Sequence, residues 1–186
     1  MRITEAAQAV QRSGFPEAYE DHAADARALA SALTGYSTGG RFTCAVGART
    51  GLDRQQPGSS GLTPRAEAVR RDVERAFGKL SLGGFAPEGV TSGHQEGSTH
   101  YEGRAVDIFV RPVNPANNRR GWAVAQYLVA QADRLDIQHV IFDKRIWTSG
   151  RRSRQGWRDY DPGSRAGNRV ILEHRDHVHV DVPEGD

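Results

Sequence analysis

Residues 177–182 read His-Val-His-Val-Asp-Val, so apolar and polar side chains alternate strictly along this stretch. A period of two residues is typical of a β-strand, because successive side chains point to opposite faces of a sheet. One face of this strand is therefore expected to pack its valines on a core. The other face carries two imidazoles and a carboxylate, so the strand is expected to serve both the fold and the chemistry.

The rest of the chain mixes helical and strand patterns. Residues 104–110 and 138–147 are rich in Val, Ile and Phe and are bounded by turn residues, which predicts two further strands. Apolar residues recur at helical spacing over residues 16–33, 64–77 and about 121–135. Since no βαβ unit repeats, we expect an α+β fold in which a mainly antiparallel sheet is flanked by helices.

The domain organisation follows from composition shifts along the chain. Residues 1–46 are expected to form an N-terminal helical segment, with Pro16 in the first turn of a helix and Gly35 ending it. Residues 47–61 consist largely of Gly, Ser, Gln, Pro and Arg, which is typical of a flexible linker or loop. The main domain is then expected to span residues 62–186.

Length and composition limit the size of the domain, the kinds of metal ligand and the presence of a transmembrane segment. The chain has 186 residues, which is long enough for one compact domain with an appendage, and its formal net charge is +2. Cys44 is the only cysteine, so any metal must be bound by His and carboxylate ligands, and we expect this thiol to be buried and inert. The chain has neither the apolar core of a signal peptide nor a run of about 20 apolar residues, so no transmembrane segment is expected.

Eight Lys and Arg residues crowd into residues 144–169. Such a stretch favours an anionic partner, although a solvated loop is an equally plain interpretation. The near-neutral net charge and the lack of a nucleic-acid-binding motif argue against nucleic acid and leave an anionic wall polymer as the competitor.

Two separate stretches offer ligands for a catalytic metal ion. A hydrolytic zinc ion needs three protein ligands from His, Asp or Glu and an open fourth position for water. His100 lies in a polar, Gly-bearing turn, and Asp107 lies in the strand that follows. Because their separation of seven positions would place them on opposite faces of an unbroken strand, the chain must bend near Gly103. In the final strand His177 and His179 share one face, and only one of them needs to be a ligand.

The pattern His-x-x-Gly-x-Ala-x-Asp, followed much later by Asp-His-Val-His, resembles the D-Ala-D-Ala carboxypeptidase and L-Ala-D-Glu endopeptidase family of zinc peptidases. The resemblance covers residues 62–182. The stretches Gly-Arg-Ala-Val-Asp, Arg-Ile-Trp and Asp-His-Val-His-Val are similar in particular to its secreted actinobacterial branch. It implies a VanY- or hedgehog/DD-peptidase-like fold, and it makes residues 62–186 a zinc peptidase-like domain.

The resemblance also implies roles for individual residues. His100, Asp107 and His179 match the three zinc ligands of the family. His177 matches a histidine that stabilises the oxyanion or orients substrate, and Ser98 matches a serine that supports the site.

Asp176 matches the carboxylate that takes a proton from the zinc-bound water. In a regular strand Asp176 would face away from the two histidines, so the strand must begin after it. If it does not, Glu173 is the next candidate base, and Glu96 and Glu102 are weaker ones.

The chain departs from the family pattern shortly before the first ligand. Many members have Gly-Tyr-Arg there, with an arginine that polarises the scissile carbonyl, whereas this chain has Gly93-His94-Gln95. Loss of the charge would cost about 2–3 kcal/mol of transition-state stabilisation. Arg104 or the basic loop are alternative sources of the charge.

For the remaining aromatic and histidine residues, only the local sequence indicates a role. Trp157, beside the basic loop, is the aromatic residue that we expect to contact a ligand. His94, His139 and His174 lack a specific pattern and are predicted to be structural or surface residues. Of the three, His174 is the first candidate for a functional role instead.

These observations predict a zinc-dependent peptidase that hydrolyses peptide bonds in peptidoglycan stem peptides or cross-bridges, as a carboxypeptidase or an endopeptidase. The alternative is a catalytically weak or inactive zinc-containing module that binds the cell wall. A nucleic-acid hydrolase is a third, weaker hypothesis. The function implies an extracellular or cell-wall-associated protein, and we expect a monomer.

Overall fold

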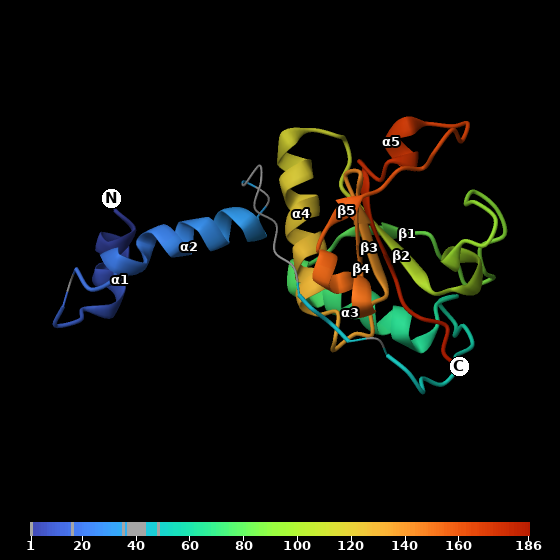
Figure 1. Cartoon of the computed structure of the whole chain (residues 1–186), viewed down its shortest axis with the longest axis horizontal. Coiled ribbons are helices and arrows are strands. Elements are labelled where there is room, and N and C mark those ends of the chain that lie inside the picture. Colours follow the sequence, from blue (N-terminus) through green and yellow to red (C-terminus); the bar gives the residue numbers. More distant parts are fainter. Residues whose placement is uncertain (1, 16, 35, 37–43, 48) are drawn as a thin grey trace.

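The computed structural model describes residues 2–15, 17–34, 36, 44–47 and 49–186, and a single sheet lies at its centre (Figure 1). The sheet has six strands in the order β1-β2-β6-β3-β4-β5, and every neighbouring pair is antiparallel. In chain order the strands are β1 (Ser81–Gly83), β2 (Ala105–Phe109), β3 (His139–Phe142), β4 (Arg145–Thr148), β5 (Arg158–Asp159) and β6 (His177–Asp181).

Helices flank this sheet, so the predicted α+β class with an antiparallel sheet is confirmed. Helices α3 and α4 pack on one face of the sheet, and the segment around α5 lies on the side away from α4 (Figure 1). The helices are α1 (Ile3–Gln11), α2 (Glu20–Leu33), α3 (Pro64–Phe77), α4 (Pro115–Ala130) and α5 (Arg169–Leu172), with 3-10 helices η1 (Thr99–Glu102) and η2 (Gly150–Gln155).

Strand β6 lies between β2 and β3, and its alternating pattern gives it one apolar and one polar face. Val178 and Val180 are at most 1% exposed and face the helices, together with alternate residues of the neighbouring strands. On the opposite face the register pairs His179 with Asp107 of β2, and Asp181 with His139 of β3. The pleat therefore gathers titratable side chains on the sheet face that the helices leave uncovered.

The helices α3 and α4 illustrate how local sequence sets element boundaries. Helix α3 spans the predicted residues 64–77, with a proline in its first turn and Gly78 after its end. Helix α4 begins earlier than predicted, because the side chain of Asn114 accepts a hydrogen bond from the backbone of Asn117 and Pro115 follows as the first helical residue.

The strand predicted at residues 138–147 is instead a hairpin. Strands β3 and β4 pair with each other across a turn at Asp143 and Lys144. Both turn residues have left-handed backbone conformations, with φ of 46° and 64°. Positive φ at two successive residues is what a tight antiparallel hairpin requires, and neither Asp nor Lys signals it as strongly as glycine would.

The N-terminal segment forms two helices, α1 and α2, which extend away from the sheet in Figure 1. Helix α2 contacts α4, and the predicted boundary residues Pro16 and Gly35 lie outside the described residues. In the predicted linker the described residues form no helix or strand, and the backbone of Gly51 and Leu52 is hydrogen-bonded to Asp186. Among the described residues, no helix is both long and apolar enough to cross a membrane.

Candidate metal centre

Three donor atoms from separate elements meet on the open face of the sheet. His100 Nε2 lies 3.1 Å from His179 Nδ1 and 3.3 Å from Asp107 Oδ1. The distance between His179 Nδ1 and Asp107 Oδ1 is also 3.3 Å. Ligands that bind zinc tetrahedrally at about 2.0–2.1 Å are separated by about 3.3 Å. The donors therefore form a triangle of the size that one face of a zinc coordination tetrahedron needs. All three side chains are buried.

His100 is positioned by the bend that its spacing to Asp107 predicts. It lies in η1, whose first turn is capped by Ser98 Oγ, and the chain then reverses at Gly103, with φ of 66°. His100 Nδ1 donates a hydrogen bond to the carbonyl oxygen of Gly84 at 2.7 Å. Because a carbonyl can only accept, Nδ1 holds the proton and the Nε2 lone pair points toward the triangle.

Asp107 projects from the middle of β2, directly opposite His179 of β6. Burial alone would raise the pKa of this carboxyl group, but its close contacts with His100 and His179 hold its pKa well below the usual value. The group is thus an ionised carboxylate, which is the form that binds a divalent cation.

His179 has a carboxylate on each side. Its Nδ1 faces Asp107, and its Nε2 lies 3.4 Å from Asp181, which also accepts a hydrogen bond from His139 Nδ1 at 2.9 Å. Burial opposes a charge on the ring, yet the hydrogen bonds with Asp107 and Asp181 raise the pKa of His179 to about 10 in the metal-free protein. A cation that takes the Nδ1 lone pair must therefore displace a proton.

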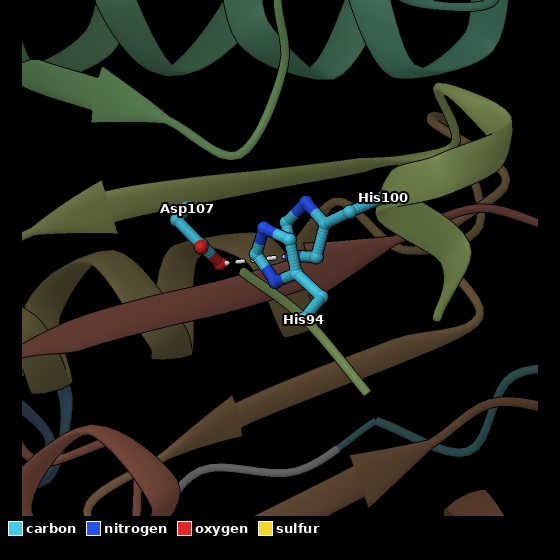
Figure 2. Close-up of side chains that lie close together, drawn as sticks. All are labelled: His94, His100 and Asp107. Carbon is cyan, nitrogen blue, oxygen red and sulfur yellow. Dashed lines mark ion pairs between the residues drawn. The ribbon is translucent and has the colours of Figure 1, made fainter. Parts of the chain in front are cut away.

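Figure 2 shows a further histidine at this site. His94, His100 and Asp107 form a group that can hold a metal ion. The ring of His94 stacks on that of His100 with centroids 3.9 Å apart, and Tyr101 holds its backbone in place. Burial, followed by the neighbouring His100, lowers the pKa of His94 and favours the neutral imidazole that binds metals.

The pair Asp176 and His177 lies beside the triangle. Asp176 immediately precedes β6, as predicted, and its carboxylate accepts hydrogen bonds from His177 Nδ1 at 2.8 Å and from Arg111 Nε at 2.6 Å. His177 Nε2 lies 3.8 Å from Asp107 Oδ1. Burial would raise the pKa of Asp176, but these two hydrogen bonds lower it, so the group is ionised and is a weak base.

A cavity of about 490 Å³ opens above these residues. Its polar floor is made by the sheet, and its walls come from the loop that leads into η1 and from the segment around α5. The apolar side chains at its border are Phe109, Ile141, Ile146, Tyr160, Ile171 and Leu172. Asp176 does not border the cavity, whereas His177, to which it is hydrogen-bonded, does.

The other predicted site residues divide into two groups. Ser98 and Gln95 border the cavity. Arg104 does not: its guanidinium is hydrogen-bonded to Glu102 and to the carbonyl oxygen of Val182. Trp157 also lies away from the cavity, and its ring packs edge-to-face on Trp122 at 5.1 Å.

Sequence reasoning missed several residues around the cavity. His94 and His139 border it, although they were predicted to be structural or surface residues, and His174, the predicted exception, borders it as well. Burial, followed by the charges of the neighbouring histidines, lowers the pKa of His174 to about 2, so this ring is neutral. A histidine in the glycine-bearing loop before a metal ligand was the available signal for His94. Nothing in the sequence marked Arg111, because its contact with Asp176 depends on the sheet.

Comparison with known protein families adds an independent finding. The model of the family described as VldE, C-terminal domain, matches residues 58–170. The chain belongs to the VldE C-terminal domain family. The part that matches the VldE C-terminal domain runs from just before α3 into α5, so it includes His94, His100 and Asp107 but ends before β6. No curated protein and no solved structure matches the chain.

Proposed function

We propose that the protein is a zinc-dependent peptidase that hydrolyses peptide bonds in the stem peptides or cross-bridges of peptidoglycan. The observation that carries the proposal is the triangle of His100 Nε2, Asp107 Oδ1 and His179 Nδ1, with edges of 3.1–3.3 Å. His94 is then a neighbour that stacks on His100, or an additional ligand. Two imidazoles and one carboxylate leave room for water, as catalytic zinc sites do.

The chemistry that we assign to the chain uses few groups. Zinc, when bound, supplies a Lewis acid that acidifies water and polarises a carbonyl group. Asp176 accepts a hydrogen bond from the Nδ1–H of His177, so Nε2 of His177, which borders the cavity, carries the lone pair that takes a proton from the attacking water. Asp176 is then a positioning residue that acts through His177, in place of the direct base expected from the sequence.

The choice of substrate depends on the resemblance to the D-Ala-D-Ala carboxypeptidase and L-Ala-D-Glu endopeptidase family. The cavity supports a peptide ligand, because its volume of about 490 Å³ is bordered by the metal centre, by apolar side chains and by Arg111 and Arg165. A function on peptidoglycan would place the protein outside the cell or at the cell wall.

The test is digestion of purified peptidoglycan fragments by the zinc-loaded full chain, with products identified by mass spectrometry. We expect cleavage that a chelator abolishes and added zinc restores. His179→Ala should lose both zinc and cleavage, whereas His22→Ala, which removes an exposed histidine of α2, should keep both. Asp176→Asn should keep zinc and lose turnover.

The outcomes separate the proposal from its alternative. About one zinc per chain without cleavage of any fragment would contradict the peptidase and favour a zinc-containing module that binds the cell wall. Cleavage that survives removal of the metal would contradict the role of zinc.

A further inference from the structure

Two arginines border the cavity, and Asp176, the carboxylate that Arg111 contacts, lies outside its border. Arg111 and Arg165 border the cavity together with the metal centre. Among the described residues, Asp107 and Asp181 are the only carboxylates at its border, and imidazoles already contact both of them. A cavity with this distribution of charge favours an anionic ligand group beside these arginines.

Arg111 is held in a fixed orientation. Asp176 accepts a hydrogen bond from its Nε at 2.6 Å, and its guanidinium lies over the ring of Phe109, 4.1 Å from the centroid. The terminal nitrogens of the guanidinium can therefore donate to a ligand with little further loss of side-chain conformational entropy. Arginine donors of this kind suit a planar carboxylate, which they bind with paired hydrogen bonds.

The position of Arg111 relative to the metal centre limits where the anion lies on the ligand. One carboxylate, that of Asp176, holds both His177 and Arg111, so the two groups occupy neighbouring places on the cavity wall. His177 in turn borders Asp107. The contacts that join Arg111 to Asp176, Asp176 to His177 and His177 to Asp107 are 2.6, 2.8 and 3.8 Å long. Since an extended peptide advances about 3.5 Å per residue, a ligand segment of a few residues spans the bond at the metal centre and the guanidinium.

We propose that Arg111, assisted by Arg165, binds a carboxylate of the peptide substrate within a few residues of the bond that is cut. This inference rests on the proposed peptidase function and specifies its substrate class. The apolar wall around Ile171 and Leu172 adds a preference for a small apolar side chain next to that carboxylate. The carboxylate is either the C-terminus of the peptide or an acidic side chain, and the experiment distinguishes the two.

The experiment uses two matched pairs of synthetic stem-type peptides and the zinc-loaded full chain. In one pair the C-terminus is a free acid or an amide, and in the other an acidic residue is Glu or Gln. We expect kcat/KM to favour the charged member of one pair by about 10- to 100-fold, the range of a charge-assisted hydrogen bond. Which pair responds identifies the source of the carboxylate.

The variants test which residue is responsible. Arg111→Gln should abolish the preference while zinc affinity stays unchanged, and Arg165→Gln, at an exposed position, should weaken it. Arg151→Gln removes the same charge outside this cavity and should leave the preference intact. Equal rates within both pairs, or a preference that survives Arg111→Gln, would overturn the inference.

Failure of hydrolysis is a separate result. If the zinc-loaded protein cleaves none of the peptides, the proposed peptidase fails, and calorimetric titration of the same peptides then tests recognition alone. Tighter binding of the charged member, lost in Arg111→Gln, would support the carboxylate site. Equal binding within both pairs would refute it.

Discussion

Replacement of Gly84 by alanine is expected to disable the metal centre although it changes none of the proposed ligand residues. Gly84 has φ of +79°, and a Cβ atom built there would lie 2.3 Å from Cε1 and 2.4 Å from Nδ1 of His100. Ordinary carbon contacts need about 3.5 Å, so the imidazole must retreat by about 1 Å. Metal–ligand distances tolerate only about ±0.2 Å, so His100 Nε2 would leave the triangle.

The magnitude has two parts. An L-residue in this backbone region costs about 1–2 kcal/mol, and overpacking against His100 adds about 1–3 kcal/mol. Zinc affinity should fall by more than about 100-fold, because the change displaces a ligand, whereas loss of an outer hydrogen bond to a ligand typically costs about 10- to 100-fold. Competition with a chromophoric chelator measures the affinity, and thermal unfolding of the metal-free protein measures the stability.

Gly89→Ala is the matched control. Gly89 has φ of +84°, and a Cβ there would meet nothing within 4 Å, so the variant shares the backbone strain but not the collision. The two variants should differ by about 1–3 kcal/mol in stability, which is a few degrees in Tm for a chain of this length. If Gly84→Ala binds zinc as tightly as Gly89→Ala, the assignment of His100 as a ligand is refuted.

Three further predictions concern the support of the site and the fold. Asp181→Asn should weaken zinc binding by about 10- to 100-fold without unfolding the protein, because Asp181 orients the ring of His179; unchanged affinity in the chelator assay would contradict this. Hydrogen bonds from arginines of α3 lower the pKa of Glu67 to about 2, against about 4.5 unfolded, so its contribution to stability is complete above pH 4.5 and is lost as the pH falls through 2. Glu67→Gln should therefore destabilise the protein near neutral pH and flatten this acid-side loss in urea titrations, and an unaltered pH profile would argue against it. Gly121→Ala would place a Cβ 2.2 Å from the ring of Phe142 and should cost about 1–3 kcal/mol in the same titrations, whereas wild-type stability would show that α4 packs less closely than described.

Much of the fold was predictable because its central strand has an unambiguous pattern. The alternation in β6 required one apolar and one polar face, and both were found. The hairpin of β3 and β4 was missed because Asp143 and Lys144 adopt left-handed conformations that neither residue type signals. The short edge strands β1 and β5 were missed because they have too few residues for a period to be recognised.

The site was predictable where two ligand-type residues lie close together in one segment of the sequence. The odd spacing between His100 and Asp107 demanded a bend, and the bend at Gly103 is present. Contacts between distant segments could not be predicted, since they depend on strand register and on loop paths. Arg111 reaches Asp176 only because β2 pairs with β6, and no local pattern encodes that meeting.

The most direct test of the proposed centre is a crystal structure of the zinc-loaded protein with anomalous difference maps on both sides of the zinc K edge. We predict one zinc ion at about 2.0–2.2 Å from His100 Nε2, His179 Nδ1 and a carboxylate oxygen of Asp107. Zinc bound by His94 with His179 left uncoordinated, or no zinc peak on this face of the sheet, would contradict the account.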